Sequence, residues 1–324
     1  MSVAVVLGAG GLVGQAFHLG ALMALMDGAG FDARDASVLV GTSAGSLVAA
    51  GLAGGLSAHE LAAHVLGRPA PDPRQPAPAQ DPGLPMPRQG RRISRDLPLR
   101  LPDQPAPTPG RGPLSPGALL AAARHPLTTR PGALAAALLP AGARSTDPVA
   151  RGVRRLHPSG WPDRDLRICA VRARDARRVV FTGDGEGPDD LGTAVAASCA
   201  IPGWFAPVRS GGETYVDGGA HSPSNADVVL ADRPDLVVII SPMSAERPAL
   251  RADLGLRLAV RSYLAAEVVR LRRAGSRVVV LQPGPGDLQV MGSNPMRGDG
   301  LGAIVDRAAA STRKRLEGDL HLLG

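Results

Sequence analysis

The chain has 324 residues, of which 44% are hydrophobic and 2% aromatic, and a formal net charge of +7. This length accommodates one large α/β domain or two small ones, with a sizeable core built from Ala, Val and Leu. Lys314 is the only lysine, so nearly all the positive charge comes from arginine. The preference for arginine, together with the abundant Ala, Gly and Pro, indicates a GC-rich coding bias. We therefore expect no nucleic-acid partner, and no zinc-finger, RNP or basic-zipper pattern is present.

Neither cysteine belongs to a recognisable pattern. Cys169 and Cys199 each lie in an apolar context, which predicts no disulfide framework and no metal site. Residues 1–26 carry no charged side chain, but they lack a basic leader region and glycines interrupt their apolar run. These features argue against a signal peptide or a membrane span, and we expect a cytoplasmic protein without a cofactor.

In chain order, the apolar patterning predicts strands that alternate with helices. Residues 3–7 form an expected strand at the centre of a parallel sheet, followed by a glycine-rich loop at 8–14 and a helix to about residue 26. Residues 37–54 are expected to form a strand, a turn and a helix. Ser57 and Glu60 have the spacing of a capping box that opens the next helix.

The composition changes at about residue 67. Residues 67–116 hold 15 of the 31 prolines, which prevents regular helix or sheet, and five arginines lie between Arg88 and Arg100. Residues 117–156 regain weak helical character. We treat 67–160 as an insertion within a single domain that spans 1–324, and its role as a linker or as a lid over the active site stays open.

The alternating pattern returns in the second half. Its expected elements are strands at 166–171, 177–182, 213–216, 236–240 and 277–281, and helices at 189–200, 250–274 and 300–317. Such alternation predicts a doubly wound, mostly parallel sheet with helices on both faces.

The segment G-T-S-A-G at residues 41–45 is the strongest chemical signal. It has the G-x-S-x-G pattern between a buried strand and a helix, where Gly41 and Gly45 allow a sharp turn that exposes Ser43. The helix N-terminus that follows favours developing negative charge. Ser43 is therefore the candidate nucleophile.

The glycine loop at 8–14 permits three interpretations. It matches a variant of the dinucleotide fingerprint, but the second strand ends in Gly41, Thr42 and Ser43, without the acidic residue that would hold a ribose. It could instead supply an oxyanion hole from the N–H groups of Gly10, Gly11 and Leu12, where losing one donor typically lowers the rate about 100- to 1000-fold. A plain tight turn is the third interpretation.

A serine nucleophile also needs a base. Asp217 lies in V-D-G-G at a predicted strand end, where Gly218 and Gly219 leave room around the carboxylate. An isolated Asp-Gly is usually only a turn. His221 would complete the chain order of an α/β-hydrolase triad, but both partners would then come from one short loop.

Taken together, these motifs resemble the patatin-like phospholipases. The glycine loop, G-T-S-A-G, A-S-C-A-I-P-G-W-F-A-P-V at 197–208 and Y-V-D-G-G at 215–219 occur in that family's order and approximate spacing. The resemblance covers residues 1–65 and 166–230. It implies a patatin-like three-layer fold, a Ser43–Asp217 catalytic dyad, an oxyanion hole at the glycine loop and lipid acyl esters as substrates.

The implied chemistry is two-step acyl transfer, with Asp217 as the base in both steps. A carboxylate of ordinary pKa, about 4, is a poor base at neutral pH, so we expect the Asp217 site to be partly desolvated. One position departs from the family: the loop commonly carries an arginine before its last glycine, and here that residue is Val13. This departure leaves open whether phospholipids or neutral lipids are preferred.

Several other residues have less specific interpretations. His18 is expected to pack or to support the site from behind, and Trp204 and Phe205 either line an acyl pocket or fill the core. Asn225 and Asp227 are expected to cap a helix and not to be catalytic.

Two rival functions remain at this stage. One is an NAD(P)-type oxidoreductase built on the glycine loop, which leaves G-T-S-A-G unexplained. The other is an inactive module that binds a membrane or a protein partner through the arginine-rich insertion. Peripheral contact with anionic membranes is compatible with either a hydrolase or a binding module, and the sequence leaves the oligomeric state open.

Overall fold

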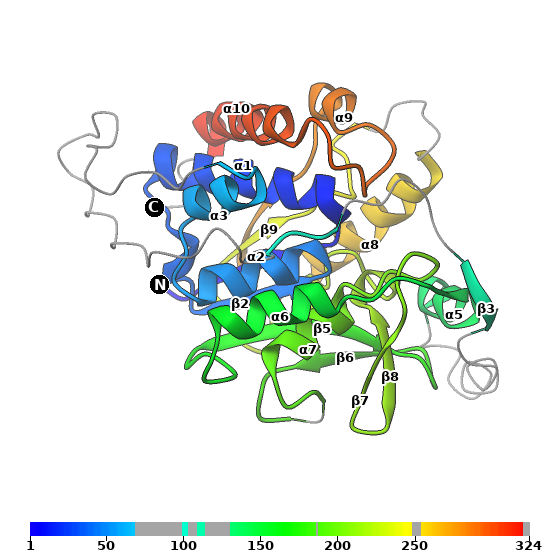
Figure 1. Cartoon of the computed structure of the whole chain (residues 1–324). Coiled ribbons are helices and arrows are strands. Elements are labelled where there is room, and N and C mark those ends of the chain that lie inside the picture. The colour runs from blue at the N-terminus through cyan, green and yellow to red at the C-terminus, as the bar shows by residue number, and fades with distance from the viewer. Residues whose placement is uncertain (69–98, 103–108, 114–129, 186, 248–253, 320–324) are drawn as a thin grey trace.

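Figure 1 shows the computed structural model of the chain, which describes residues 1–68, 99–102, 109–113, 130–185, 187–247 and 254–319. Most of the predicted Pro/Arg-rich stretch therefore lies outside the described residues. The lid hypothesis and the single-domain assignment remain predictions.

Eight strands form one sheet with the order β10-β9-β1-β2-β5-β8-β7, and β6 also pairs with β5. The strands span Val3–Leu7 (β1), Val38–Thr42 (β2), Asp165–Arg172 (β5), Arg177–Phe181 (β6), Val208–Ser210 (β7), Glu213–Asp217 (β8), Leu236–Ile240 (β9) and Arg277–Leu281 (β10). Strands β10, β9, β1, β2 and β5 run parallel to one another. Strands β6 and β8 are antiparallel to β5, and β7 is antiparallel to β8. The predicted mostly parallel sheet is confirmed, with β1 near its centre.

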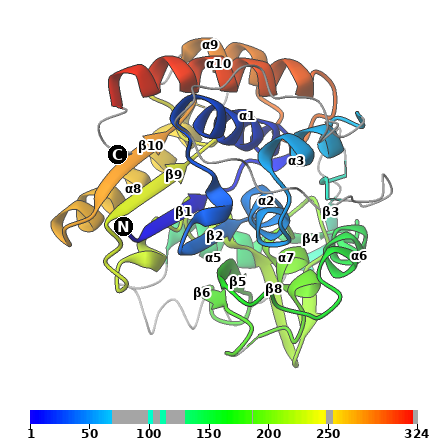
Figure 2. The ribbon, with the colours of Figure 1, turned by 90° about the vertical axis from the view of Figure 1, so that its left-hand side faces the viewer.

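Helices cover both faces of this sheet (Figure 2). They span Gly11–Ala29 (α1), Ala44–Ala53 (α2), Ala58–Val65 (α3), Pro131–Leu138 (α5), Asp147–Leu156 (α6), Leu191–Ser198 (α7), Leu254–Arg273 (α8), Pro285–Met291 (α9) and Leu301–Asp319 (α10), with short 3₁₀ turns at Ala33–Asp35 (η1), Gly218–Ala220 (η2) and Ala226–Val229 (η3). The predicted patatin-like three-layer architecture is thus observed. A separate pair of short strands, Pro109–Pro113 (β3) and Pro140–Gly142 (β4), lies off the main sheet.

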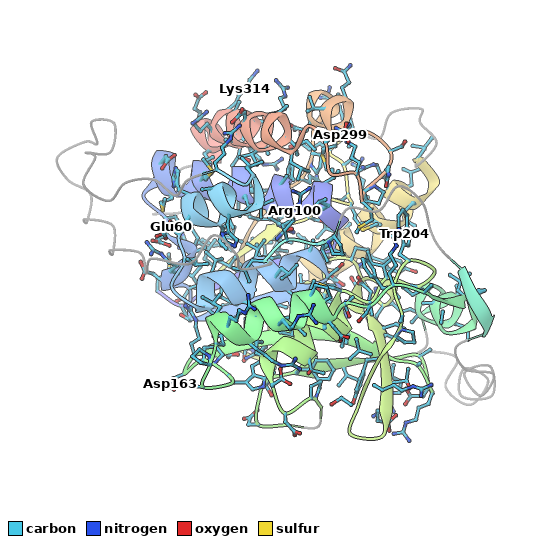
Figure 3. All side chains as sticks on the ribbon, in the orientation of Figure 1. Glu60, Arg100, Asp163, Trp204, Asp299 and Lys314 are labelled. Atoms are coloured by element: carbon cyan, nitrogen blue, oxygen red, sulfur yellow. The ribbon has the colours of Figure 1, made fainter. Side chains whose placement is uncertain are left out.

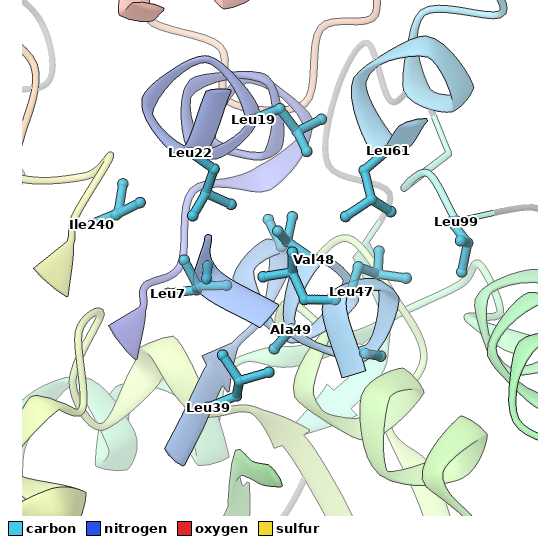
Figure 4. Packing of buried hydrophobic residues seen from close by; sticks show 14 of the residues in the cluster. Leu7, Leu19, Leu22, Leu39, Leu47, Val48, Ala49, Leu61, Leu99 and Ile240 are labelled. Carbon is cyan, nitrogen blue, oxygen red and sulfur yellow. The ribbon is translucent and has the colours of Figure 1, made fainter. Parts of the chain in front are cut away.

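Alternate side chains of the central strand enter different layers. Val5 and Leu7 of β1 belong to the larger core with α1, α2 and α10, whereas Ala4 and Val6 pack in the smaller core with α8. All five residues of β1 are buried, as expected of a strand covered on both faces. Figure 4 shows leucines of β1, β2, α1, α2 and α3 meeting in the larger core.

Helix α1 is long and apolar enough in composition to pass as a membrane span, yet 72% of its most apolar window is buried inside the protein. It lies between the sheet and α10 (Figure 2). A Cβ on Gly20 would stand 2.3 Å from the carbonyl oxygen of Val305, so the two helices pack closely because this residue is glycine. We conclude that α1 is a core helix of the fold.

Most element boundaries follow the sequence patterns closely. The capping box of Ser57 and Glu60 is present at α3, and α1 ends at a left-handed Gly30, a few residues beyond the predicted end. The short strands β3, β4 and β7 and the helix α9 were not predicted. The prediction that the prolines of 67–116 prevent regular sheet is wrong at β3, where the prolines stand at the first and last positions of a strand in a two-stranded pair. Strands β4 and β7 have three residues each and α9 has seven, which is too few for a hydrophobic period to be recognised.

Residues 99–102 are the part of the insertion that is fixed against α1. Leu99 and Leu101 are buried in the larger core. The Gln15 amide nitrogen donates to the Leu99 carbonyl at 2.7 Å, and its carbonyl oxygen accepts from the Leu101 N–H at 3.4 Å. Arg100, near the centre of Figure 3, donates to the Gly298 carbonyl at 3.3 Å. The insertion is therefore anchored one turn from the glycine loop.

Candidate active site

Ser43 occupies the strained turn that the G-x-S-x-G pattern predicts. It links β2 to α2 with φ 54° and ψ −125°, in the region that non-glycine residues rarely adopt. A Cβ on Gly45 would come within 2.0 Å of the Leu7 carbonyl oxygen, and one on Gly41 within 2.5 Å of the Ser46 Cα. Both glycines are needed because the turn packs directly against β1 and against its own helix.

The backbone of Ser43 is held by neighbouring elements. Its N–H donates to the Ser198 hydroxyl at 2.9 Å, and that hydroxyl donates to the Cys169 carbonyl of β5 at 2.6 Å. The Ser43 carbonyl accepts from the Ser46 hydroxyl at 2.6 Å and from the Cys199 thiol at 3.3 Å. The strained conformation is therefore fixed from β5, α7 and α2 together.

Asp217 ends β8, two strands away from the end of β2. Strand β5 lies between them and pairs Cys169 with Thr42 on one side and Ala170 with Asp217 on the other. Gly218 must be glycine, because a Cβ there would stand 2.2 Å from the Cys169 carbonyl oxygen. This close approach carries the chain across the end of β5 and places Asp217 near Ser43.

The environment of Asp217 suits a general base. Burial raises the pKa of its carboxyl to about 7, while the neighbouring Ser43 hydroxyl and the Gly219 N–H oppose the rise. Oδ1 accepts from Gly219 at 2.7 Å, and Oδ2 is buried and makes no hydrogen bond in the described structure. The expected desolvation is therefore present, and it gives a carboxylate that can accept a proton near neutral pH.

The glycine loop presents unpaired backbone donors beside these two side chains. Gly8 and Ala9 donate to the carbonyls of Ile240 and Pro223, and Val13 and Gly14 donate to those of Pro295 and Gly10. Within the described part of the chain, the N–H groups between them, those of Gly10, Gly11 and Leu12, make no hydrogen bond. They form the free N-terminus of α1, where a developing negative charge is favoured.

Close packing brings these three segments together. A Cβ on Gly45 would meet the carbonyl oxygens of Leu7 and Gly8, and one on Gly219 would stand 2.9 Å from the Ala9 side chain. The turn at Ser43 and the turn after Asp217 thus both contact the strand end that leads into the glycine loop. The candidate residues of G-T-S-A-G, D-G-G and the glycine loop therefore lie next to one another in the fold.

In the described part of the chain, neither His221 nor His18 makes a hydrogen bond to Ser43 or Asp217. His221 has Arg178, Arg130 and Asp227 as its electrostatic neighbours, and burial together with the two arginines lowers its pKa to about 4. His18 is fully buried, and its Nε2 donates to the Gly8 carbonyl at 2.7 Å. Burial lowers the His18 pKa to about 4, so this neutral ring supports the start of the glycine loop from behind, as expected.

The remaining candidates are structural. Phe205 is buried in the larger core and Trp204 packs against it half-buried. Cys169 and Cys199 are free, buried thiols whose pKa values burial raises. Among the described residues, His, Cys, Asp and Glu nowhere gather in threes that could hold a metal ion.

Two features of the site escaped sequence reasoning. Asn225 is the N-cap residue of η3, but its side chain makes no cap hydrogen bond and instead donates to Thr42 and to the turn after Asp217. Pro295, from the loop after α9, accepts a hydrogen bond from the glycine loop. Both are long-range contacts between segments that no local pattern connects.

A family model covers the segments that carry these residues. The family model of the patatin-like phospholipases matches residues 5–230, which include the end of β1, the turn at Ser43 and the D-G-G turn. The chain belongs to the patatin-like phospholipase family. This membership places it among lipid acyl hydrolases, and the match ends before β9, so β9, β10 and α8 to α10 lie beyond it.

The chain is also similar to two solved structures. VipD from Legionella pneumophila shares 12% identity at a TM-score of 0.43, over 98% of this chain and 67% of VipD. The type III effector protein ExoU shares 19% identity at a TM-score of 0.36, over 98% of this chain and 53% of ExoU. This patatin-like chain thus spans about half the length of ExoU. A search of the curated proteins finds no match.

The glycine loop gives a first test of the site. In the variant Gly11→Ala, we expect ester hydrolysis to fall about 100- to 1000-fold, as when one oxyanion donor is lost. Gly11 has φ +61°, and a Cβ there would stand 2.5 Å from the Pro295 carbonyl oxygen, so the loop must move. Hydrolysis rates and thermal unfolding are measured for both proteins.

Gly28→Ala on the same helix is the matched control. The nearest side-chain atom to a Cβ there is 3.8 Å away, so the variant should keep full activity and gain some stability from helix propensity. Equal activity in Gly11→Ala and wild type would show that the conformation of the loop does not matter for turnover.

Proposed function

We propose that the protein is a serine lipid acyl hydrolase, of phospholipase A, lysophospholipase or esterase type, that uses a Ser43–Asp217 dyad. The observation that carries the proposal is the buried Asp217 carboxyl, with a pKa of about 7, next to a serine on a strained turn. A base is most effective when its pKa lies near the operating pH. No metal or other cofactor is needed for this chemistry.

In the first step, the Ser43 hydroxyl attacks the ester carbonyl carbon while Asp217 accepts the hydroxyl proton. The carbonyl oxygen becomes an oxyanion, which the N–H groups of Gly10, Gly11 and Leu12 stabilise. The intermediate collapses to an acyl-serine, and the proton on Asp217 passes to the leaving alcohol or lysolipid. Water then attacks the acyl-serine with Asp217 again as the base, which releases the fatty acid and restores Ser43.

The substrate is a lipid acyl ester, and the head group follows from the site only in part. At the loop position where the family commonly has an arginine, this chain has Val13, whose side chain is buried in the core. This position therefore provides no cation for an anionic head group. We propose a cytoplasmic enzyme that meets anionic membranes peripherally, because the chain carries a net charge of +7. The NAD(P) hypothesis lacks an acidic residue at the end of β2, which ends in Gly41 and Thr42.

Fluorophosphonate labelling of the wild-type protein tests the proposal. We expect one covalent adduct, on Ser43, located by mass spectrometry of the digested protein. Labelling should accompany hydrolysis of p-nitrophenyl esters, and a chain-length series, together with anionic and zwitterionic phospholipid vesicles, defines the preferred substrate. A folded protein that neither labels nor hydrolyses these esters, even with vesicles present, would instead support the inactive binding module.

A further inference from the structure

Asn225 connects the two segments that carry the proposed dyad. Its amide nitrogen donates to the Thr42 hydroxyl at 3.1 Å and to the Gly218 carbonyl at 3.3 Å. Thr42 immediately precedes Ser43, and Gly218 immediately follows Asp217. One fully buried side chain therefore spans the end of β2 and the end of β8, on either side of β5.

The conformation of Asn225 is itself unusual. Its φ of 51° and ψ of 31° lie in the left-handed region, which Asn adopts more readily than most residues. The same amide nitrogen donates to the Ser222 carbonyl at 2.5 Å, and the Asn225 N–H donates to the Ser222 hydroxyl at 3.2 Å. The loop from 222 to 226 is thus folded around this amide.

A buried carboxylate from α8 holds that loop. Glu267 is fully buried and accepts from the hydroxyls of Ser222 and Ser224 at 2.7 and 2.6 Å and from the Ala226 N–H at 3.0 Å. Arg130, at the start of α5, lies 3.9 Å from the same carboxylate. Glu267 belongs to the part of the chain beyond the family match, so the C-terminal region reaches the site through this network.

We propose that Asn225 is a positioning residue that fixes Asp217 relative to Ser43, and that Glu267 holds Asn225 in place. This inference rests on the proposed Ser43–Asp217 chemistry. The amide of Asn225 donates to neither the carboxylate nor the nucleophile, and it acts through the backbone and side chain of their chain neighbours. Its loss leaves the serine and the acid present but free to shift apart, and misplacement by about 1 Å can lower a rate about 100-fold.

The test uses Asn225→Gly, with Arg233→Gly as the matched control. Glycine adopts a left-handed conformation without strain, so Asn225→Gly removes the amide and leaves the backbone free to keep its native φ. Arg233 is an exposed residue with φ 47°, which makes Arg233→Gly the same backbone change away from the site. In Asn225→Gly we expect kcat to fall about 10- to 100-fold with a nearly unchanged KM. In Arg233→Gly we expect no change in either constant.

The pH profile separates positioning from mere stability. The wild-type rate should rise through about pH 7 as Asp217 loses its proton. Loosening the loop admits water to Asp217, so the midpoint of this rise should move to lower pH in Asn225→Gly. No charged side chain contributes to the Asp217 pKa, and the Cys199 thiol that its charge affects has a pKa raised by burial, so it stays protonated in this range.

Two further variants complete the experiment. Asn225→Asp keeps the size of the side chain and an acceptor for Arg178 but replaces both N–H donors by a buried carboxylate, so it should lower kcat at least as much as Asn225→Gly does. Glu267→Gln keeps a carbonyl acceptor and should produce a smaller loss of kcat in the same direction. Activity that falls only with the folded fraction, at an unchanged pH midpoint, would overturn the positioning role.

The proposed function and this inference can fail separately. If the wild type shows no labelling of Ser43, the dyad itself is wrong and the inference falls with it. If Ser43 labels and the Asn225 variants turn over as fast as Arg233→Gly, only the positioning role is overturned.

Discussion

The variant Ser43→Ala should lose fluorophosphonate labelling completely and lower ester hydrolysis by at least ~1000-fold, since removal of a catalytic nucleophile has effects of this size or larger. The hydroxyl oxygen is the atom that would form the acyl intermediate, and alanine has no such atom. The backbone contacts of residue 43 use its N–H and carbonyl, so they survive the substitution. The measurements are adduct formation by mass spectrometry and initial rates with a short-chain ester.

Two controls separate the hydroxyl from the strained backbone of Ser43. Ser43→Gly adopts φ 54° without strain, so it should be equally inactive although its turn is relaxed. Ser262→Ala removes an exposed hydroxyl from α8 that only donates to the Ala259 carbonyl, and it should behave as wild type. Residual turnover above a few per cent in both Ser43 variants would show that another nucleophile carries the reaction.

Local patterns predicted the first half of the site well. The strand, turn and helix around Ser43 are contiguous in sequence, and their boundaries follow from apolar runs and glycines. The structure also gives a physical reason for each of the four motif glycines, because a Cβ on Gly41, Gly45, Gly218 or Gly219 would press on a neighbouring segment. Short-range steric requirements of this kind can be recognised in the sequence as glycines at fixed positions of a motif.

The second half of the site depended on the family resemblance. V-D-G-G by itself is compatible with an ordinary turn, and only the fold shows that β5 places its aspartate beside Ser43. The roles of Asn225 and Glu267 could not be predicted for the same reason, because their partners are distant in sequence. Asn225 and Thr42, for example, are 183 residues apart. A polar side chain whose hydrogen-bond partners are so distant in sequence forms no local pattern of periodicity or spacing from which its role could be predicted.

At Asp217 the requirements of catalysis and of stability conflict, because the buried carboxylate that accepts a proton also destabilises the folded protein. A substitution there should therefore change activity and stability in opposite directions. The variant Asp217→Asn should lower hydrolysis at neutral pH by at least ~1000-fold because an amide cannot accept the serine proton. It should nevertheless be more stable than the wild type at pH 8. The Gly219 N–H can still donate to the amide oxygen of the new side chain, so the fold keeps its hydrogen bond at Oδ1.

The sign of this stability effect follows from the Asp217 pKa. Burial raises it from an ordinary value of 3.8 to about 7 in the folded protein. The folded state therefore binds the proton more tightly than the unfolded chain, and the stability that this gives is complete below pH 3.8 and lost as the pH rises through about 7. Above that pH the wild type carries a buried charge that Asp217→Asn lacks.

The expected result is a gap in melting temperature between Asp217→Asn and wild type that is largest at pH 8 and nearly closed at pH 4. The corresponding difference in unfolding free energy is on the order of a few kcal/mol. Thermal unfolding of both proteins across this pH range measures it, and Asp175→Asn, at a carboxyl whose pKa the Arg172 ion pair lowers, should show the opposite trend. A gap that stays constant with pH would mean that Asp217 is already charged throughout this range. Its burial would then leave the dyad without a base tuned to neutral pH.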